Sequence, residues 1–123
     1  MYNQAAAAYQ KMSQTGVNPR DLEATLLMKA AGKLQNVVDN WEEMTPDDLN
    51  EQLTYNRRLW TYLLAAVRDE GNPLPDQIKM NITNLGVFIM NRTLEVLRHP
   101  NPQRMEALIS INRNIAEGLR GRG

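Results

Sequence analysis

Asparagine followed by arginine occurs inside three stretches of this chain that otherwise have the apolar spacing of helices. The three pairs are Asn56-Arg57, Asn91-Arg92 and Asn112-Arg113. Asparagine is a weak helix former, and a buried amide without a hydrogen-bond partner costs free energy. Amides at such positions therefore either pair with a neighbouring helix or bind a partner.

Two of these asparagines lie on the apolar stripe of their own helix. Asn56 is one turn from Leu53 and from Trp60, and Asn112 lies between Leu108 and Ile115 on its own stripe, whereas Asn91 lies beside its stripe. A buried asparagine on a helical seam commonly fixes register by pairing across helices. We therefore expect Asn56 and Asn112 to form a structural polar seam, with direct ligand contact as the alternative.

The neighbouring side chains are candidates for contacting a partner. Arg57 and Arg113 fall at the edges of the stripes, where acidic groups of another helix or protein can reach them. Tyr55, Arg58 and Trp60 combine cations with aromatic rings, as single-stranded RNA sites do. The alternative is arginine stacked on tyrosine at an ordinary helix surface. Equal numbers of basic and acidic residues, 14 of each, argue against a phosphate-binding protein.

Groups that could perform catalysis are sparse. The only histidine, His99, lies in a turn after a helix, where it complements the helix dipole. The acidic pairs lie at helix ends, none has a histidine at helical spacing, and the chain has no cysteine. Because an active site needs converging reactive groups, we expect no enzyme, no cofactor and no metal site.

Length and composition indicate one soluble domain, residues 1–123. The chain is 42% hydrophobic and 23% charged, which is typical of a folded protein rather than a disordered one. The N-terminus lacks the charge and apolar core of a signal peptide, and the longest apolar run, Leu85 to Met90, cannot span a membrane. We expect a cytoplasmic protein that does not insert into membranes.

Proline marks the starts of four long helices. It follows a good capping residue in Asn18-Pro19, Thr45-Pro46 and Asn101-Pro102, and a poor one in Leu74-Pro75. Apolar residues at helical spacing follow each start, and no stretch alternates like a strand. Because the longest connection is short, Arg68 to Leu74, this pattern predicts an all-α fold, an antiparallel up-down bundle.

Further details follow from the same spacing. Tyr2 to Gln14 predicts a shorter N-terminal helix, and we expect residues 120–123 to form a frayed tail. The apolar stripe of the first long helix extends to Trp41, and that of the third begins at Ile78. Gly86 within the third long helix predicts close approach of another backbone.

Several of these motifs, in this order, resemble the flagellar biosynthesis regulatory protein FlaF family of alphaproteobacteria. The resemblance runs from end to end and is carried by Met1-Tyr2, Arg20 to Ala24, Tyr55 to Trp60, Asn72 to Pro75, Asn81 to Phe88 and Ile111 to Leu119. It implies a small all-helical cytoplasmic protein needed for flagellin production and filament assembly.

The resemblance leaves two functions to separate. One is a flagellin-binding chaperone or export adaptor, whose helical groove would cover the amphipathic terminal helices of flagellin. The other is a post-transcriptional regulator acting on flagellin messenger RNA together with the partner regulator FlbT. A homodimer that uses the groove as its own interface is a third alternative.

Overall fold

The part of the chain described by the computed structural model, residues 18–121, consists of helices and the short links between them. Its α-helices are α2 (Pro19–Asp39), α3 (Pro46–Arg68), α4 (Asp76–Arg98) and α5 (Pro102–Leu119), and a 3-10 helix, η1 (Trp41–Glu43), joins α2 to α3. No β-strand occurs in these residues, which confirms the all-α class. The short helix expected over Tyr2 to Gln14 lies outside the described residues.

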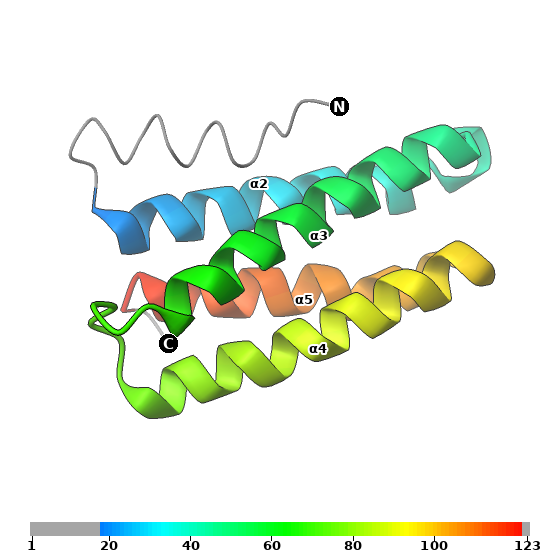
Figure 1. Cartoon of the computed structure of the whole chain (residues 1–123). Coiled ribbons are helices and arrows are strands. Elements are labelled where there is room, and N and C mark those ends of the chain that lie inside the picture. The colour runs from blue at the N-terminus through cyan, green and yellow to red at the C-terminus, as the bar shows by residue number, and fades with distance from the viewer. Residues whose placement is uncertain (1–17, 122–123) are drawn as a thin grey trace.

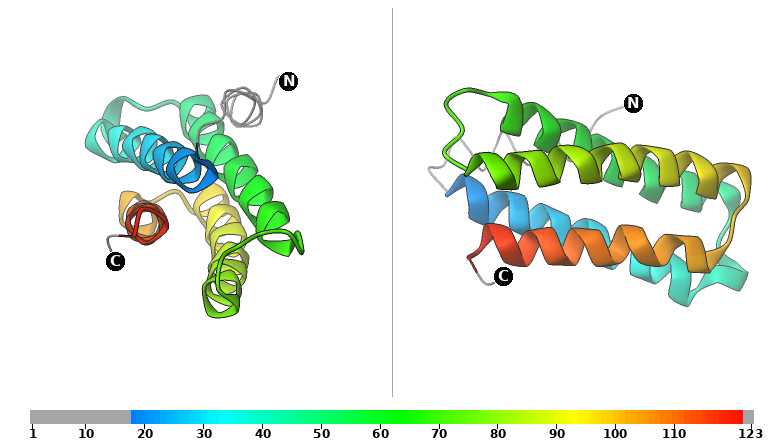
Figure 2. Two further views of the ribbon diagram at one scale, coloured as in Figure 1. Left: turned by 90° about the vertical axis from the view of Figure 1, so that its left-hand side faces the viewer. Right: turned by 90° about the horizontal axis from the view of Figure 1, so that it is seen from below.

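The four α-helices run antiparallel to their chain neighbours and form a bundle (Figure 1). The most extensive contact joins α2 to α5, followed by α3 to α4, α2 to α3 and then α4 to α5, and other pairs of elements touch less. Seen from the end, the four helices form a ring in which α4 lies diagonally opposite α2 (Figure 2). α4 is therefore the helix with the least cover.

The expected capping residues begin three of the helices. Thr45 and Asp48 form a complete capping box at α3. The side chains of Asn18 and Asn101 each accept a hydrogen bond from the backbone N–H two residues later. These bonds satisfy N–H groups that a helix start leaves free, and proline at the next position needs none. α4 has Pro75 at its cap position and no side-chain cap, in line with its weaker start signal.

In every α-helix one row of buried residues repeats at alternating intervals of three and four, as in coiled coils, and α2, α3 and α5 bury further residues beside that row. The inner rows are Glu23, Leu27, Ala30, Leu34 and Val37 in α2; Leu49, Leu53, Asn56, Trp60, Leu63 and Val67 in α3; Ile82, Gly86, Ile89, Thr93 and Val96 in α4; Met105, Ile109, Asn112, Ala116 and Leu119 in α5. The core therefore lies along the bundle axis, where the four rows meet.

Two ends of the expected apolar stripes were wrong. The first long helix stops at Asp39, before Trp41. It stops there because the side chain of Asn40 donates to the backbone oxygen and to the Oδ1 atom of Asn36, both at 2.9 Å. Ile78 was expected in the core stripe but is 39% exposed, and the buried row of α4 begins one turn later, at Ile82.

Gly86 allows a close approach, but of a side chain rather than of a backbone. A Cβ atom at Gly86 would lie 2.6 Å from Cδ2 and 3.0 Å from Cγ of Leu64 in α3. The expected backbone contact was therefore wrong. The missing side chain lets Leu64 fill the space between α3 and α4.

Side chains also join the helix ends. Arg20 in α2 donates to the Asn72 Oδ1 atom at 3.5 Å, and Asn72 in turn donates to the Ala66 carbonyl and accepts from the Leu74 N–H. The link between α3 and α4 is thereby tied to the start of α2. Beyond α5, Arg120 donates to Thr25 Oγ1 at 3.1 Å, and residues 122–123 of the expected frayed tail lie outside the described residues.

Gly86→Ala tests the contact with Leu64. Overpacking costs about 1–3 kcal/mol, and alanine gains about 1 kcal/mol over glycine in a helix. We therefore expect the variant to lower the free energy of unfolding by about 1 kcal/mol in urea titrations. In a Leu64→Ala background the clash is absent, so the same change should stabilise the protein. Equal effects in the two backgrounds would contradict the assignment.

Candidate functional site

Three polar side chains from α3 and α5 meet in the middle of the bundle. Trp60 Nε1 donates to Asn112 Oδ1 at 2.8 Å, and Asn112 Nδ2 donates to Asn56 Oδ1 at 2.7 Å. Asn112 Nδ2 also donates to the Leu27 carbonyl of α2 at 3.4 Å. All three side chains are fully buried. We call Asn56, Trp60 and Asn112 the amide seam.

The direction of these hydrogen bonds is fixed by the indole. An indole N–H can only donate, so Asn112 must present its oxygen to Trp60 and its nitrogen to Asn56. Asn56 then accepts with its oxygen, which leaves its Nδ2 atom without a hydrogen-bond partner. Rotating the Asn56 amide would place two N–H donors against each other. The seam therefore has one arrangement.

This arrangement binds helices together and offers no reactive group. Sliding α3 against α5 by one residue, about 1.5 Å, would break bonds that water cannot replace in the core. Asn112 contacts both α3 and α2, and is thus the centre of the seam. Its geometry suits the register role that we predicted for Asn56 and Asn112.

The residues expected to contact a partner lie in different places. Trp60, expected at a binding surface, is 0% exposed and belongs to the amide seam, because its row faces the bundle axis. Tyr55 is half-buried, and burial raises the pKa of its hydroxyl above the ordinary value. The cation over its ring is Lys33 of α2, 5.2 Å from the ring centre, rather than Arg58. Arg58 is half-buried and Arg57 is exposed.

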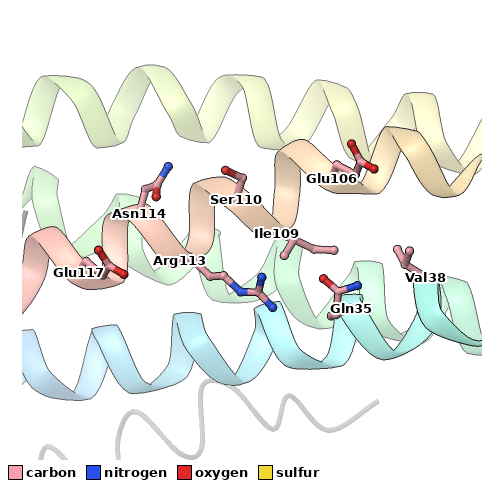
Figure 3. Close-up of a pocket in the computed structure, with 8 residues that line it drawn as sticks. All are labelled: Gln35, Val38, Glu106, Ile109, Ser110, Arg113, Asn114 and Glu117. Atoms are coloured by element: carbon pink, nitrogen blue, oxygen red, sulfur yellow. The ribbon is translucent and has the colours of Figure 1, made fainter.

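Arg113 lies at a shallow hollow between α2 and α5. The hollow has a volume of about 410 Å³ and includes Gln35, Ile109, Arg113 and Glu117. Arg113 extends from α5 toward α2, beside Gln35 (Figure 3). Because the lining mixes both charges with amides, this hollow has neither the apolar wall nor the converging polar groups of a ligand pocket.

The outward side of α4 is the surface that our sequence analysis missed. Six of the eight large apolar side chains that are exposed in the described residues belong to this helix, Ile78, Met80, Val87, Phe88, Leu94 and Leu97. Four of them join half-buried Met90 and exposed Thr83 in a second row at intervals of three and four, which we call the outer row: Met80, Thr83, Val87, Met90, Leu94 and Leu97. Contiguous apolar surface of this kind marks an interaction site.

A signal for the outer row was present in the sequence. From Thr83 onward each outer residue directly follows an inner one, as Val87 follows Gly86 and Leu97 follows Val96. Two adjacent rows with the same period look like one broad apolar face. Only the structure separates the row that α3 and α5 cover from the row that they leave open.

Other site types find no support in residues 18–121. No carboxylate and imidazole groups gather there in the number that a metal ion requires. None of the helices in that range has the combined length and apolar character of a membrane span.

Comparison with known proteins links the chain to one family. A family model described as flagellar protein FlaF matches residues 5–119. No curated protein and no solved structure matched the chain. The matched range includes all four α-helices of the bundle and therefore both the amide seam and the outer row.

The two asparagines should differ in their effect on stability. Asn112→Leu leaves the Trp60 N–H and the Asn56 oxygen unpaired, so we expect it to lower the free energy of unfolding by about 3 kcal/mol. Asn56→Leu also removes the unpartnered Nδ2 atom, so its cost should be about 1 kcal/mol. Urea unfolding of both variants measures this order. A larger loss for Asn56→Leu would show that Asn112 is not the centre of the seam.

Proposed function

Because the chain belongs to the FlaF family of flagellar proteins, we propose that it is a cytoplasmic, non-enzymatic chaperone or export adaptor that binds flagellin. The observation that supports this function best is the outer row of α4. It is an apolar surface on a rigid helix, and it has the spacing to receive another amphipathic helix. The terminal segments of flagellin are such helices, and covering them would delay polymerisation until export.

The energies fit a reversible complex. Met80, Val87, Leu94 and Leu97 are 58, 59, 50 and 41% exposed, respectively. Covering the exposed half of one such side chain contributes about 1 kcal/mol, so the four together contribute about 4 kcal/mol. The partner helix adds a similar amount, and ordering costs reduce the total. A micromolar complex, tight enough to protect and weak enough to release, is what such a surface supports.

The regulator alternative has less support from the site. Trp60, one of the rings that was to stack on RNA bases, lies in the core, and Tyr55 is half-buried beside Lys33. Contact with messenger RNA or with FlbT stays a prediction. A gel-shift titration at low salt, with and without FlbT, measures it, and salt-sensitive binding lost in Arg58→Ala would favour the regulator.

Calorimetry with purified monomeric flagellin tests the proposal. We expect heat of binding with a Kd of about 1–10 μM. Asn56→Leu should bind with unchanged affinity, because the amide seam lies inside the bundle. The absence of heat at tens of micromolar, about −6 kcal/mol, would contradict the chaperone function. Loss of binding in Asn56→Leu at an unchanged melting temperature would contradict the structural role of that residue.

A further inference from the structure

We propose that the outer row of α4 and the adjacent side of α3 form one helix-binding furrow, which selects an amphipathic helix with carboxylates along the edges of its apolar stripe. The inference rests on the proposed function, because it assigns the partner-binding surface of the chaperone and the chemistry of the segment that it receives.

The outer row lies on the α3 side of α4. Each of its members after Met80 follows an inner residue, so the row is turned by about 100° from the core. The missing Cβ atom of Gly86 faces Leu64 of α3, whereas Glu95 bonds to Arg104 of α5 at 3.4 Å. Around the axis of α4, Gly86 lies on the edge of the inner row that is nearest the outer row. Because Gly86 faces α3, the outer row also borders α3.

α3 supplies the facing side of the furrow in the same way. Arg57, Thr61, Leu64 and Arg68 directly follow the buried residues Asn56, Trp60, Leu63 and Val67. Leu64 packs at Gly86. Because α3 and α4 are antiparallel neighbours (Figure 1), Arg68 lies toward the start of α4 and Arg57 toward its end. Both arginines are exposed.

The edges of this furrow are cationic in a chain whose total charge is balanced. Arg57 and Arg68 border it on α3, and Lys79 and Arg98 lie next to Met80 and Leu97 on α4. Glu95, which directly follows Leu94, also adjoins the outer row and is the one carboxylate of α4 that does so between Lys79 and Arg98. Glu95 is engaged by Arg92 and Arg104 on the α5 side.

A helix with acidic edges complements this surface. Exposed ion pairs are individually weak, so the four cations would choose among apolar helices rather than hold one by themselves. Apart from Glu95, whose carboxylate is paired, the other polar residues of the outer border are Asn84 and Asn91, which are uncharged and exposed and accept either charge on the partner. The four cations therefore determine which partner helix binds.

A second copy of the chain fits less well. Pairing two outer rows would bring Lys79 and Arg98 from both copies to the edges of one interface. The e and g positions that flank such a seam carry the charges that specify coiled-coil partners. In α4 these positions between 79 and 98 hold Lys79, Asn84, Gly86, Asn91, Thr93 and Arg98, which include no carboxylate. Two copies would gain no ion pair there.

Two synthetic helices test the charge selection. Both are about three heptads long with leucine at a and d; one has glutamate at e and g, and the other has lysine there. In calorimetry with the full chain at low salt, the glutamate helix should bind at least about tenfold more tightly, and added salt should reduce the difference. Equal affinities would overturn the proposal. Arg57→Glu with Arg68→Glu should reduce or invert the preference.

Two α4 variants test the surface. Val87→Glu with Leu94→Glu should abolish binding of the glutamate helix without changing the melting temperature, because both positions are exposed. Met28→Glu is the matched control, because Met28 is 38% exposed on α2, away from the furrow. This variant should bind the glutamate helix as tightly as the unaltered chain does. Equal binding by the α4 double variant would overturn the proposal.

The same variants separate this inference from the proposed function. If flagellin binds the unaltered chain and the α4 double variant equally, the furrow assignment fails and the chaperone function stands. If flagellin does not bind but the glutamate helix still requires Val87 and Leu94, the chaperone function fails and the furrow stands. Sedimentation showing a dimer that the double variant dissociates would overturn the proposal in favour of a second copy.

Discussion

The indole N–H of Trp60 donates its hydrogen bond to Asn112 at the centre of the bundle, and the positions of three helices depend on that bond. Because an indole nitrogen cannot accept, it orients the Asn112 amide, which then binds Asn56 in α3 and the Leu27 carbonyl in α2. Apolar rows at coiled-coil spacing can slide past one another at modest cost. Directional bonds between buried groups remove that freedom at a single level of the bundle.

α4 takes no part in this network, and its different role follows from that. Its inner row has only three large apolar residues, and the other two members are Gly86 and Thr93. The Thr93 hydroxyl donates to the Ile89 carbonyl of the same helix. The seam thus unites α2, α3 and α5, whereas α4 is attached mainly by packing against α3. A helix that packs on α3 through its inner row and leaves an apolar outer row uncovered beside that contact is a rigid support for a partner helix. The same division explains why substitutions in the seam and on α4 should have separable effects.

Much of this fold followed from the sequence, because its signals are local. Thr45-Pro46 predicted a capped helix start, and the spacing of Asn56 and Asn112 placed both amides on inner rows. The remaining features depend on contacts between residues that are far apart in the sequence, so only the structure shows them. Nothing near Gly86 in the chain identifies Leu64 as its neighbour, and a periodic row reveals neither the hydrogen-bond partner of the Trp60 indole nor whether Ile78 is covered. The outer row of α4 was hidden because it has the same period as the inner row beside it.

Hydrogen exchange of the chain alone and saturated with flagellin tests the central claim, that α4 is the surface presented to the partner. The account predicts that amides of α4 and of the adjoining half of α3 exchange more slowly in the complex, while those of α5 are unchanged. Slower exchange confined to α2 and α5, around the hollow at Arg113, with α4 unaffected, would contradict it.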